Sequence, residues 1–319
     1  MLRDLNTPRI LVFAYGDVGV ACLQELLDRG ANVVAVVTHR DDPAETIRFA
    51  SVARLAGAHR IPSHTPGNPN TPEFVEDIRR LKPDLIFSFY YRRLLCPATL
   101  DIPRLGAINL HGSLLPKYRG RAPLNWVLIH GETLTGVTLH YMDALADHGD
   151  IIAQRSVPIA IEDTALTLLG KLVGAARILL AESYPLIAAG RAPRTPQDHA
   201  AATTFGRRRP ADGWIDWSRS AWEIYNLIRA VTRPFPGAFT CLGDRRVFLW
   251  RARPPRARST PAPPGTILGV GEDGVLEVAT RDGILEVTAI QPEGALEMDG
   301  AEFLAVLQKS TTAARSQFG

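Results

Sequence analysis

The stretch AINLHGSLLPKYRGRAPLNWVLIHGETLTGVTLHYMDALADHGDIIAQ, residues 107–154, organises the rest of the chain. It begins as an apolar strand that stops at Gly112. Side chains two apart on a strand share a face, so Asn109 and His111 are expected to point the same way. In an open α/β sheet, ligands bind beyond the carboxyl ends of the strands. The pattern therefore predicts either a ligand site built on these two side chains or a hydrogen-bonded pair that closes a core strand.

The residues after this strand favour the ligand site. A basic loop occupies 117–121, and the helix predicted over 123–129 starts at a proline, which suits a first helical turn. Residues 136–140 read as a second strand, and 143–149 read as a loop that carries Asp147. Polar and basic loops that follow apolar strands are typical of a site placed at the edge of a sheet.

The motifs of this stretch are N-x-H, then SLLPxxRGxxP, then TGVT and a D-x-G loop, and together they resemble the signature of the folate-dependent formyltransferases. The resemblance extends to VFAYGD, SVARLA, FSFYYRRL and the later FGRR, RAV and PFPGAF, so it covers most of the chain. The segment KYRGRAPLNWV is most similar to the corresponding segment of family members that formylate UDP-4-amino-4-deoxy-L-arabinose, which are enzymes of polymyxin resistance. The resemblance implies an enzyme that moves the formyl group of N10-formyltetrahydrofolate onto an amine.

By position, the resemblance implies a catalytic trio of Asn109, His111 and Asp147. The amide of Asn109 would donate to the oxyanion, which is typically worth roughly 3 kcal/mol. His111 would carry the proton, and the carboxylate of Asp147 would orient the ring and raise its basicity, as in other triads. The resemblance also implies a folate site lined by Arg93, Leu94, Leu95, Arg121, Asp143, Ala144, Leu145 and Ala146.

Several of these side chains have simpler interpretations. Arg121 could be a solvated surface charge, while Lys117 and Arg119 could meet substrate phosphates or nothing at all. His130, His140 and His148 show no spacing of metal ligands, so satisfied or solvated histidines are favoured and no metal is expected. Tyr141 and His148 fall outside the motif and could tune the choice of substrate.

Composition bounds the class of protein. The chain has 319 residues, 46% of them hydrophobic and 22% charged, with a formal net charge of +3. This is an ordinary globular composition, and the charge neither demands nor excludes a polyanionic partner. Cys22, Cys96 and Cys241 are too few and too scattered for a disulfide framework or a zinc site. No apolar run approaches about 18 residues, and there is no room for a signal peptide before the first strand. We therefore expect a soluble cytoplasmic protein with no membrane contact.

The first part of the chain has the pattern of an α/β domain. An apolar strand at 10–14, a helix at 18–27 and a second strand at 32–38 predict a right-handed parallel crossover. The turn YGDVG lacks the first glycine of a dinucleotide fingerprint, so its glycines are expected to serve a tight turn and close packing. The expected Rossmann-like parallel sheet also includes a buried strand at 84–90. Further helices are predicted at 45–55, 71–81 and 164–189.

The last part differs in character. Polar, alanine-rich residues at 191–206 predict a linker. We therefore place a catalytic formyltransferase domain at 1–203 and a second domain at 204–319. A helix is predicted at 220–231, then short alternating strands separated by turn signals, then a terminal helix at 299–307. The strands are expected at 247–252, 266–270, 275–279 and 284–290. For these strands the resemblance implies a small OB-like β-barrel.

The identity of the amine stays open between several classes. Methionyl-tRNA formyltransferases carry a basic, glycine-rich insertion after the second strand, but 38–45 here is mixed in sign. The second domain does contain many arginines, so tRNA is the less favoured substrate and not an excluded one. The amine could also belong to a related 4-amino-sugar nucleotide, and a non-catalytic folate- or nucleotide-binding protein could share the same fold. The resemblance further implies a role in lipid A modification, with the decarboxylase either on a separate partner chain or absent from a stand-alone formylase. A homo-oligomer is also left open.

Overall fold

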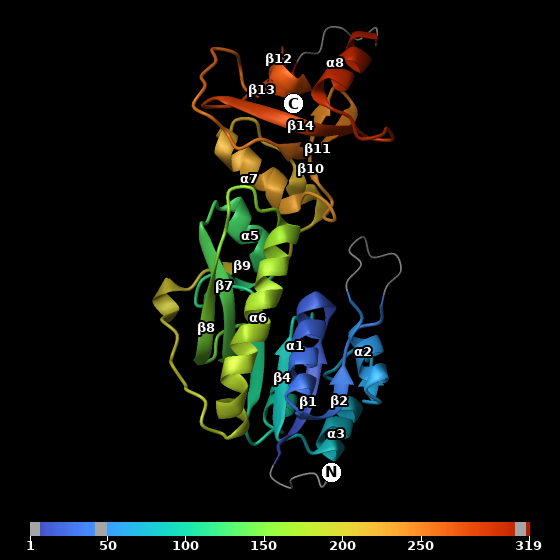
Figure 1. The fold of residues 1–319 in the computed structure, drawn as a ribbon, viewed down its shortest axis with the longest axis vertical. Helices are drawn as coiled ribbons and strands as arrows, with labels where there is room; N and C mark the ends of the chain where they lie inside the picture. Colours follow the sequence, from blue (N-terminus) through green and yellow to red (C-terminus); the bar gives the residue numbers. More distant parts are fainter. Residues whose placement is uncertain (1–6, 42–49, 310–316) are drawn as a thin grey trace. The chain divides into compact units, whose positions relative to one another are not determined.

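The computed structural model describes residues 7–41, 50–309 and 317–319. The chain folds into two compact units (Figure 1). Unit 1 comprises the described residues of Met1–Pro123, Leu134–Pro158 and Leu169–Gly206. Unit 2 comprises the described residues of Leu124–Thr133, Ile159–Leu168 and Arg207–Gly319.

Unit 1 is built on a seven-stranded sheet with the order β3-β2-β1-β4-β5-β7-β8. The first five strands in this order run parallel, so the predicted parallel crossover and the α/β fold are confirmed. β7 runs antiparallel to β5, and β8 runs antiparallel to β7. This change of direction was not part of the expected parallel sheet. The connection from β7 to β8 is too short for a parallel crossover, which needs a dozen or more residues. The strands are β1 (Arg9–Ala14), β2 (Asn32–Val37), β3 (Ser63–His64), β4 (Leu85–Phe89), β5 (Ala107–His111), β7 (Leu134–Tyr141) and β8 (Ile151–Pro158).

Helices cover both faces of this sheet. On one face, α1 lies beside α6, and Arg177 of α6 forms ion pairs with Glu25 and Asp28 of α1 (Figure 1). On the other face, Ile78 of α3 and Leu100 of α4 join the apolar core formed by β1, β2 and β4. The helices are α1 (Gly16–Asp28), α2 (Val52–Ala58), α3 (Pro72–Leu81), α4 (Pro97–Leu100) and α6 (Ala165–Ala188), whose first turn belongs to unit 2.

The helix predicted at 45–55 is placed differently. α2 begins at Val52, after Ser51, whose hydroxyl accepts a hydrogen bond from the Arg54 backbone N–H at 3.2 Å. Such a side-chain cap satisfies a donor of the first helical turn and fixes where the helix starts. The earlier part of the prediction, 45–49, lies outside the described residues.

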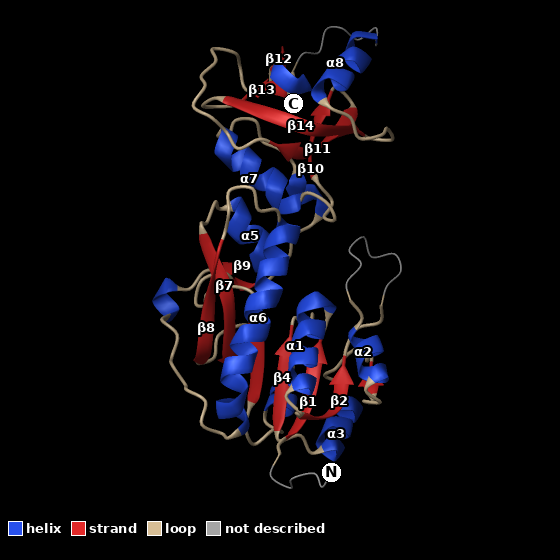
Figure 2. Cartoon of the chain, viewed as in Figure 1, coloured by secondary structure: helices blue, strands red, loops and turns tan. Residues whose placement is uncertain are grey.

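Unit 2 contains a five-stranded antiparallel sheet with the order β10-β11-β14-β13-β12 (Figure 2). Four of these strands were predicted, and β10 was missed because its short AFTCL run lies between glycine-containing turns. The predicted helices are present as α5, α7 and α8, and α7 starts with a reciprocal cap between Ser220 and Glu223. The elements are α5 (Pro123–Ile129), α7 (Ala221–Val231), β10 (Ala238–Leu242), β11 (Arg245–Ala252), β12 (Ile267–Val270), β13 (Leu276–Ala279), β14 (Ile284–Pro292) and α8 (Gly300–Lys309).

The segment predicted as a linker, 191–206, is packed against unit 1. Thr195 exchanges two backbone hydrogen bonds with Ile151 at 2.8 and 3.0 Å. Further on, β9 (Thr204–Phe205) pairs in parallel with β6 (Arg119–Gly120). A polar, alanine-rich composition describes a solvated linker and a backbone-paired segment equally well, and composition alone could not separate them.

Within the described parts of the chain, no helix combines the length and the apolar character that a membrane crossing requires.

Candidate active site

Asn109 and His111 lie on one face of β5, as their spacing predicts. His111 is the last residue of the strand and is buried. The neighbouring strand β7 runs antiparallel and pairs His140 directly with Asn109. Residues opposite each other in such a pair have adjacent side chains, so β7 adds a third polar group to this face.

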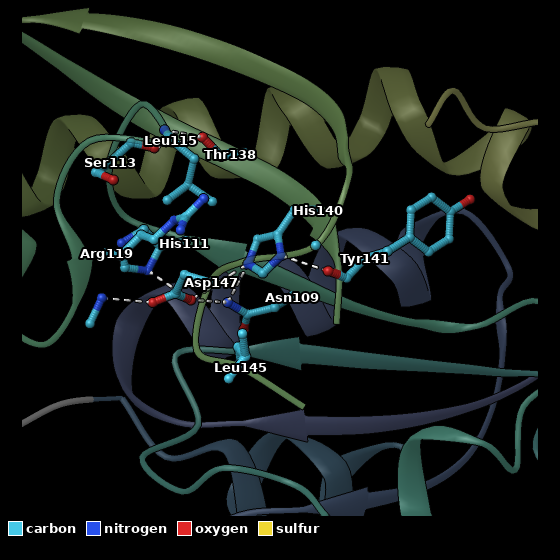
Figure 3. A network of polar contacts seen from close by, with 12 residues as sticks. Asn109, His111, Ser113, Leu115, Arg119, Thr138, His140, Tyr141, Leu145 and Asp147 are labelled. Atoms are coloured by element: carbon cyan, nitrogen blue, oxygen red, sulfur yellow. Dashed lines mark hydrogen bonds and ion pairs between the residues drawn. The ribbon is translucent and has the colours of Figure 1, made fainter. Parts of the chain in front are cut away.

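Asp147 completes the cluster from the loop after β7. Its Oδ1 lies 3.3 Å from the Asn109 Nδ2, 3.4 Å from the His111 Nδ1 and 3.5 Å from the His140 Nε2. Its Oδ2 accepts a hydrogen bond from the Gly120 backbone N–H at 2.8 Å (Figure 3). The structure therefore brings together all three members of the predicted trio, and it joins them to the basic loop.

The carboxylate of Asp147 is held in its ionised form. Burial by itself would raise the pKa of this carboxyl group. Attraction to His111 and His140 and the hydrogen bond from the Gly120 N–H outweigh burial and lower the pKa well below its ordinary value. The site therefore carries a fixed negative charge beside two imidazole rings.

The His111 ring has a defined orientation. Its Nε2 lies 2.7 Å from the Tyr118 carbonyl oxygen, and a carbonyl oxygen only accepts, so Nε2 carries a hydrogen. In the neutral ring, Nδ1 is then the basic nitrogen, and it faces the Asp147 carboxylate. The backbone carbonyl thus orients the ring, and the carboxylate is placed to stabilise the positive charge that appears when Nδ1 takes a proton.

His140 is a site residue that the sequence analysis did not assign. Its Nδ1 donates to the Tyr141 carbonyl oxygen at 2.8 Å, so in the neutral ring its Nε2 is an acceptor. That Nε2 lies 3.1 Å from the Asn109 Nδ2. Both hydrogens of the Asn109 amide are therefore directed at acceptors, His140 and Asp147. The antiparallel pairing of the TGVTLH strand with the NxH strand is the signal that could have revealed this contact.

Backbone strain is concentrated around the cluster. Tyr90, Tyr118, Ala122 and Asp147 all have a left-handed backbone, with φ of 58°, 60°, 53° and 54°. Each such residue costs about 1–3 kcal/mol and persists only where the surroundings fix it, typically at ligand sites. This strain supports a functional site at the ends of β4, β5 and the loop after β7.

Gly120 is constrained by its surroundings as well as by its φ of 91°. A Cβ at this position would lie 2.4 Å from the Phe205 carbonyl oxygen. We expect Gly120→Ala to lower the free energy of unfolding by about 1–3 kcal/mol or more and to reduce activity, because the Gly120 N–H holds Asp147. Urea denaturation measures the first effect.

Gly170→Ala is the control for this variant. It lies at a helical site with nothing within 4 Å of the added Cβ, so it should be neutral or slightly stabilising. Equal stabilities of the two variants would contradict this account.

The predicted folate residues lie on two exposed loops and on the basic loop. Leu94 and Leu145 are 65% and 61% exposed, whereas Leu95 is buried in the core. Arg93 and Arg121 are exposed, and the Arg121 Nη2 donates to the Arg92 carbonyl oxygen at 2.9 Å, which ties the basic loop to the segment after β4. The remaining predicted residues, Asp143, Ala144 and Ala146, are exposed on the loop that leads to Asp147.

Of the other candidate side chains, His148 has two local partners. The Asp143 Oδ2 lies 2.6 Å from the His148 Nδ1, and the His148 ring stacks on His199. Lys117 is exposed, whereas Arg119 is buried. Among the residues that the structure describes, no group of three His, Cys, Asp or Glu side chains could hold a metal ion.

Two family models match the chain. Residues 8–183 match the family described as formyl transferase, and residues 208–308 match the formyl transferase C-terminal domain. Because the first match spans more than half of the chain, this protein belongs to the formyl transferase family.

Solved structures of similar fold include the following three proteins. WlaRD, a sugar 3N-formyl transferase studied with dTDP and 5-N-formyl-THF, is 19% identical, with 91% of this chain and 99% of that chain covered and a TM-score of 0.68. The N-formyltransferase from Helicobacter canadensis, in complex with folinic acid and dTDP-3-aminofucose, is 20% identical, with 91% and 99% covered and a TM-score of 0.67. HypX from Aquifex aeolicus, in complex with tetrahydrofolic acid, is 20% identical, with a TM-score of 0.63. The match to HypX covers 95% of this chain and only 48% of HypX, so the chain spans about half its length.

Proposed function

We propose that this protein transfers the formyl group of N10-formyltetrahydrofolate to the amino group of a nucleotide-linked amino sugar. The observation that carries the proposal is the convergence of Asn109, His111 and Asp147 at the end of β5, in a chain of the formyl transferase family. A buried ring beside a fixed carboxylate, with an amide next to both, provides the groups that acyl transfer requires.

The reaction makes one demand on each member of the trio. The amine nitrogen attacks the formyl carbon, loses a proton, and displaces N10, which gains a proton. The Nδ1 of His111, which faces Asp147 and carries no hydrogen in the neutral ring, is the position that receives the proton from the amine and returns it to N10. Asp147 stabilises the ring while the proton is on it, and Asn109 donates to the formyl oxygen as that oxygen becomes negative.

Asn109 must release one of its present contacts to play this part. Its Nδ2 lies 3.1 Å from the His140 Nε2 and 3.3 Å from the Asp147 Oδ1. The longer contact is the weaker one, so we expect the substrate oxygen to replace Asp147 as its acceptor. His140 would keep the amide oriented throughout.

The exposed loops offer apolar surface and positive charge for the folate. A planar, partly apolar ring system needs apolar surface that is not already covered, and Leu94 and Leu145 provide such surface on the two loops. Arg121, held by the Arg92 carbonyl oxygen, supplies a positive charge on the basic loop. We propose that these residues, with Arg93, Leu95, Asp143, Ala144 and Ala146, line the folate site.

For the amine, we propose UDP-4-amino-4-deoxy-L-arabinose or a related 4-amino-sugar nucleotide. The KYRGRAPLNWV motif supports this choice. We further propose that catalysis resides in residues 1–203 and that 204–319 form an accessory domain.

Transfer to methionyl-tRNA is less well supported. Several arginines of unit 2 are paired with carboxylates. Arg246 lies 3.7 Å from Glu293, and Arg258 lies 2.6 Å from Glu277. Arginines neutralised in this way contribute less to phosphate binding, which depends on free positive charge.

The test is a formyl-transfer assay that offers the UDP-amino sugar and methionyl-tRNA separately, each with N10-formyltetrahydrofolate. We expect formylation of the sugar nucleotide, with a KM that depends weakly on salt. Transfer to tRNA alone, with a steep dependence on salt, would contradict the proposed substrate and would leave the catalytic trio in place.

A further inference from the structure

The basic loop (residues 117–121) and the loop that carries Asp147 (residues 143–149) are held together by a third segment. Residues 195–205, called the brace below, contact both loops. At one end Thr195 pairs with Ile151, next to the loop that carries Asp147. At the other end β9 pairs with β6, which contains Gly120.

Gln197, in the middle of the brace, contacts both loops with its side chain. It is 6% exposed. Its Nε2 donates to the Asp147 carbonyl oxygen at 3.0 Å and to the Gly149 carbonyl oxygen at 2.7 Å. Its Oε1 accepts from the Arg119 Nη2 at 2.6 Å and from the Arg119 Nε at 3.2 Å. Both amide hydrogens and the carbonyl oxygen of this side chain are therefore engaged, which makes the orientation of the amide unambiguous.

These contacts act on a residue whose backbone is strained. Asp147 has a φ of 54°, a conformation that a non-glycine residue keeps only when its neighbours fix it. The Gly120 N–H holds its carboxylate and Gln197 holds its carbonyl oxygen. Without the second contact, the loop can relax toward a more favourable φ, and the carboxylate would move relative to His111.

Arg119, which lies on the basic loop, is also buried against the brace. The Arg119 Nη2 lies 2.9 Å from the His199 Nδ1, in addition to its contacts with Gln197. Its backbone N–H donates to the Thr203 carbonyl oxygen at 2.8 Å. Arg119 thus connects Gln197 to the same loop that supplies the Gly120 N–H, so Gln197 couples the positions of both loops around Asp147.

We propose that Gln197 is a positioning residue for formyl transfer, which acts through Asp147 by fixing the backbone of its loop. This inference rests on the proposed function, because it assigns Gln197 a part in the same reaction. Gln197 touches no reacting atom. Its contribution is the geometry of the carboxylate beside His111.

The variant Gln197→Glu tests this most sharply. A carboxylate keeps Arg119 paired but cannot donate to the carbonyl oxygens of Asp147 and Gly149. We expect kcat for formyl transfer to fall by about 10- to 100-fold, as small displacements of catalytic groups commonly produce. The KM for each substrate should change by less than about threefold, because an interaction that matters only in the transition state affects kcat.

Gln291→Glu in unit 2 is the matched control. The Gln291 side chain has a similar arrangement, since Oε1 accepts from Arg233 and Trp250 and Nε2 donates to one carbonyl oxygen, that of Ala295. We expect this variant to lose stability as Gln197→Glu does, with an unchanged kcat. A drop in kcat that simply follows the loss of thermal stability in both variants would overturn the proposal.

A double-mutant cycle with Asp147→Asn shows whether Gln197 acts through Asp147. Once the carboxylate is absent, adding Gln197→Glu should change the single-turnover rate by less than about threefold. An equal fold-change in both backgrounds would overturn the proposal. Gln197→Ala, which lets water reach the two carbonyl oxygens, serves if the glutamate variant does not fold; wild-type kcat in Gln197→Ala would also overturn it. Full activity of Asp147→Asn would overturn the proposal by removing the role of its carboxylate, whereas the proposed function fails only if the wild-type protein transfers no formyl group.

Discussion

Replacement of His111 by alanine is expected to lower kcat for formyl transfer by about 10²- to 10⁴-fold, the usual contribution of general acid–base catalysis. The basis is the Nδ1 of His111, which carries no hydrogen in the neutral ring because the ring hydrogen lies on Nε2, where it is donated to the Tyr118 carbonyl oxygen. A steady-state assay of tetrahydrofolate release measures the effect.

His59→Ala is the control for this variant. His59 is exposed at the end of α2 and has no place in the site, so its replacement should leave kcat unchanged. Circular dichroism and a thermal melt check that the His111 variant is folded. Full activity in a well-folded His111→Ala protein would remove His111 from the mechanism.

The second large effect is expected for Asp147→Asn. Asparagine tolerates the left-handed backbone that Asp147 adopts, so the loop can keep its shape. The negative charge beside the His111 and His140 rings is lost, and with it the stabilisation of the protonated His111. We expect kcat to fall by about 10²- to 10⁴-fold, as when a triad carboxylate is made neutral. A rate within a few-fold of wild type would show that the charge is not required.

The same variant has a pH signature in its stability. The native protein favours the ionised carboxylate, so the pKa of Asp147 lies below its ordinary value of 3.8. A pKa lowered by folding adds stability that is fully present above about pH 4 and is lost as the pH falls through the native pKa. The gap in unfolding free energy between wild type and Asp147→Asn should therefore shrink as the pH drops from neutral toward about pH 3. Urea denaturation across this range measures the gap, and a constant gap would contradict the linkage.

Local sequence patterns were enough for most of the fold. The apolar strands, their helices and the order of elements follow from runs and periodicities that lie within a few residues of one another. The short connection makes β8 antiparallel to β7, whereas the direction of β7 itself depends on its pairing with β5. β10 was missed because a short run between turns has little periodicity to detect.

For the site, the sequence indicated residue types and their order, but not all of their contacts. Asn109 and His111 share a face because they are two apart on a strand, which is a local rule. The contact of His140 with Asn109 depends on the register between β5 and β7. The role of the brace depends on the pairing of Thr195 with Ile151, which are far apart in the chain. Register and long-range pairing are tertiary properties, and composition described this segment only as polar.

A single-turnover measurement of formyl transfer tests most directly whether this protein formylates an amino-sugar nucleotide through His111. Wild-type protein in excess over N10-formyltetrahydrofolate is mixed with UDP-4-amino-4-deoxy-L-arabinose, and tetrahydrofolate and the formylated sugar nucleotide are followed together. We expect both products to appear at the same rate, only when the amine is present, and we expect His111→Ala to lose this rate. Release of tetrahydrofolate at one rate with and without the amine, or an unchanged rate in His111→Ala, would contradict this expectation.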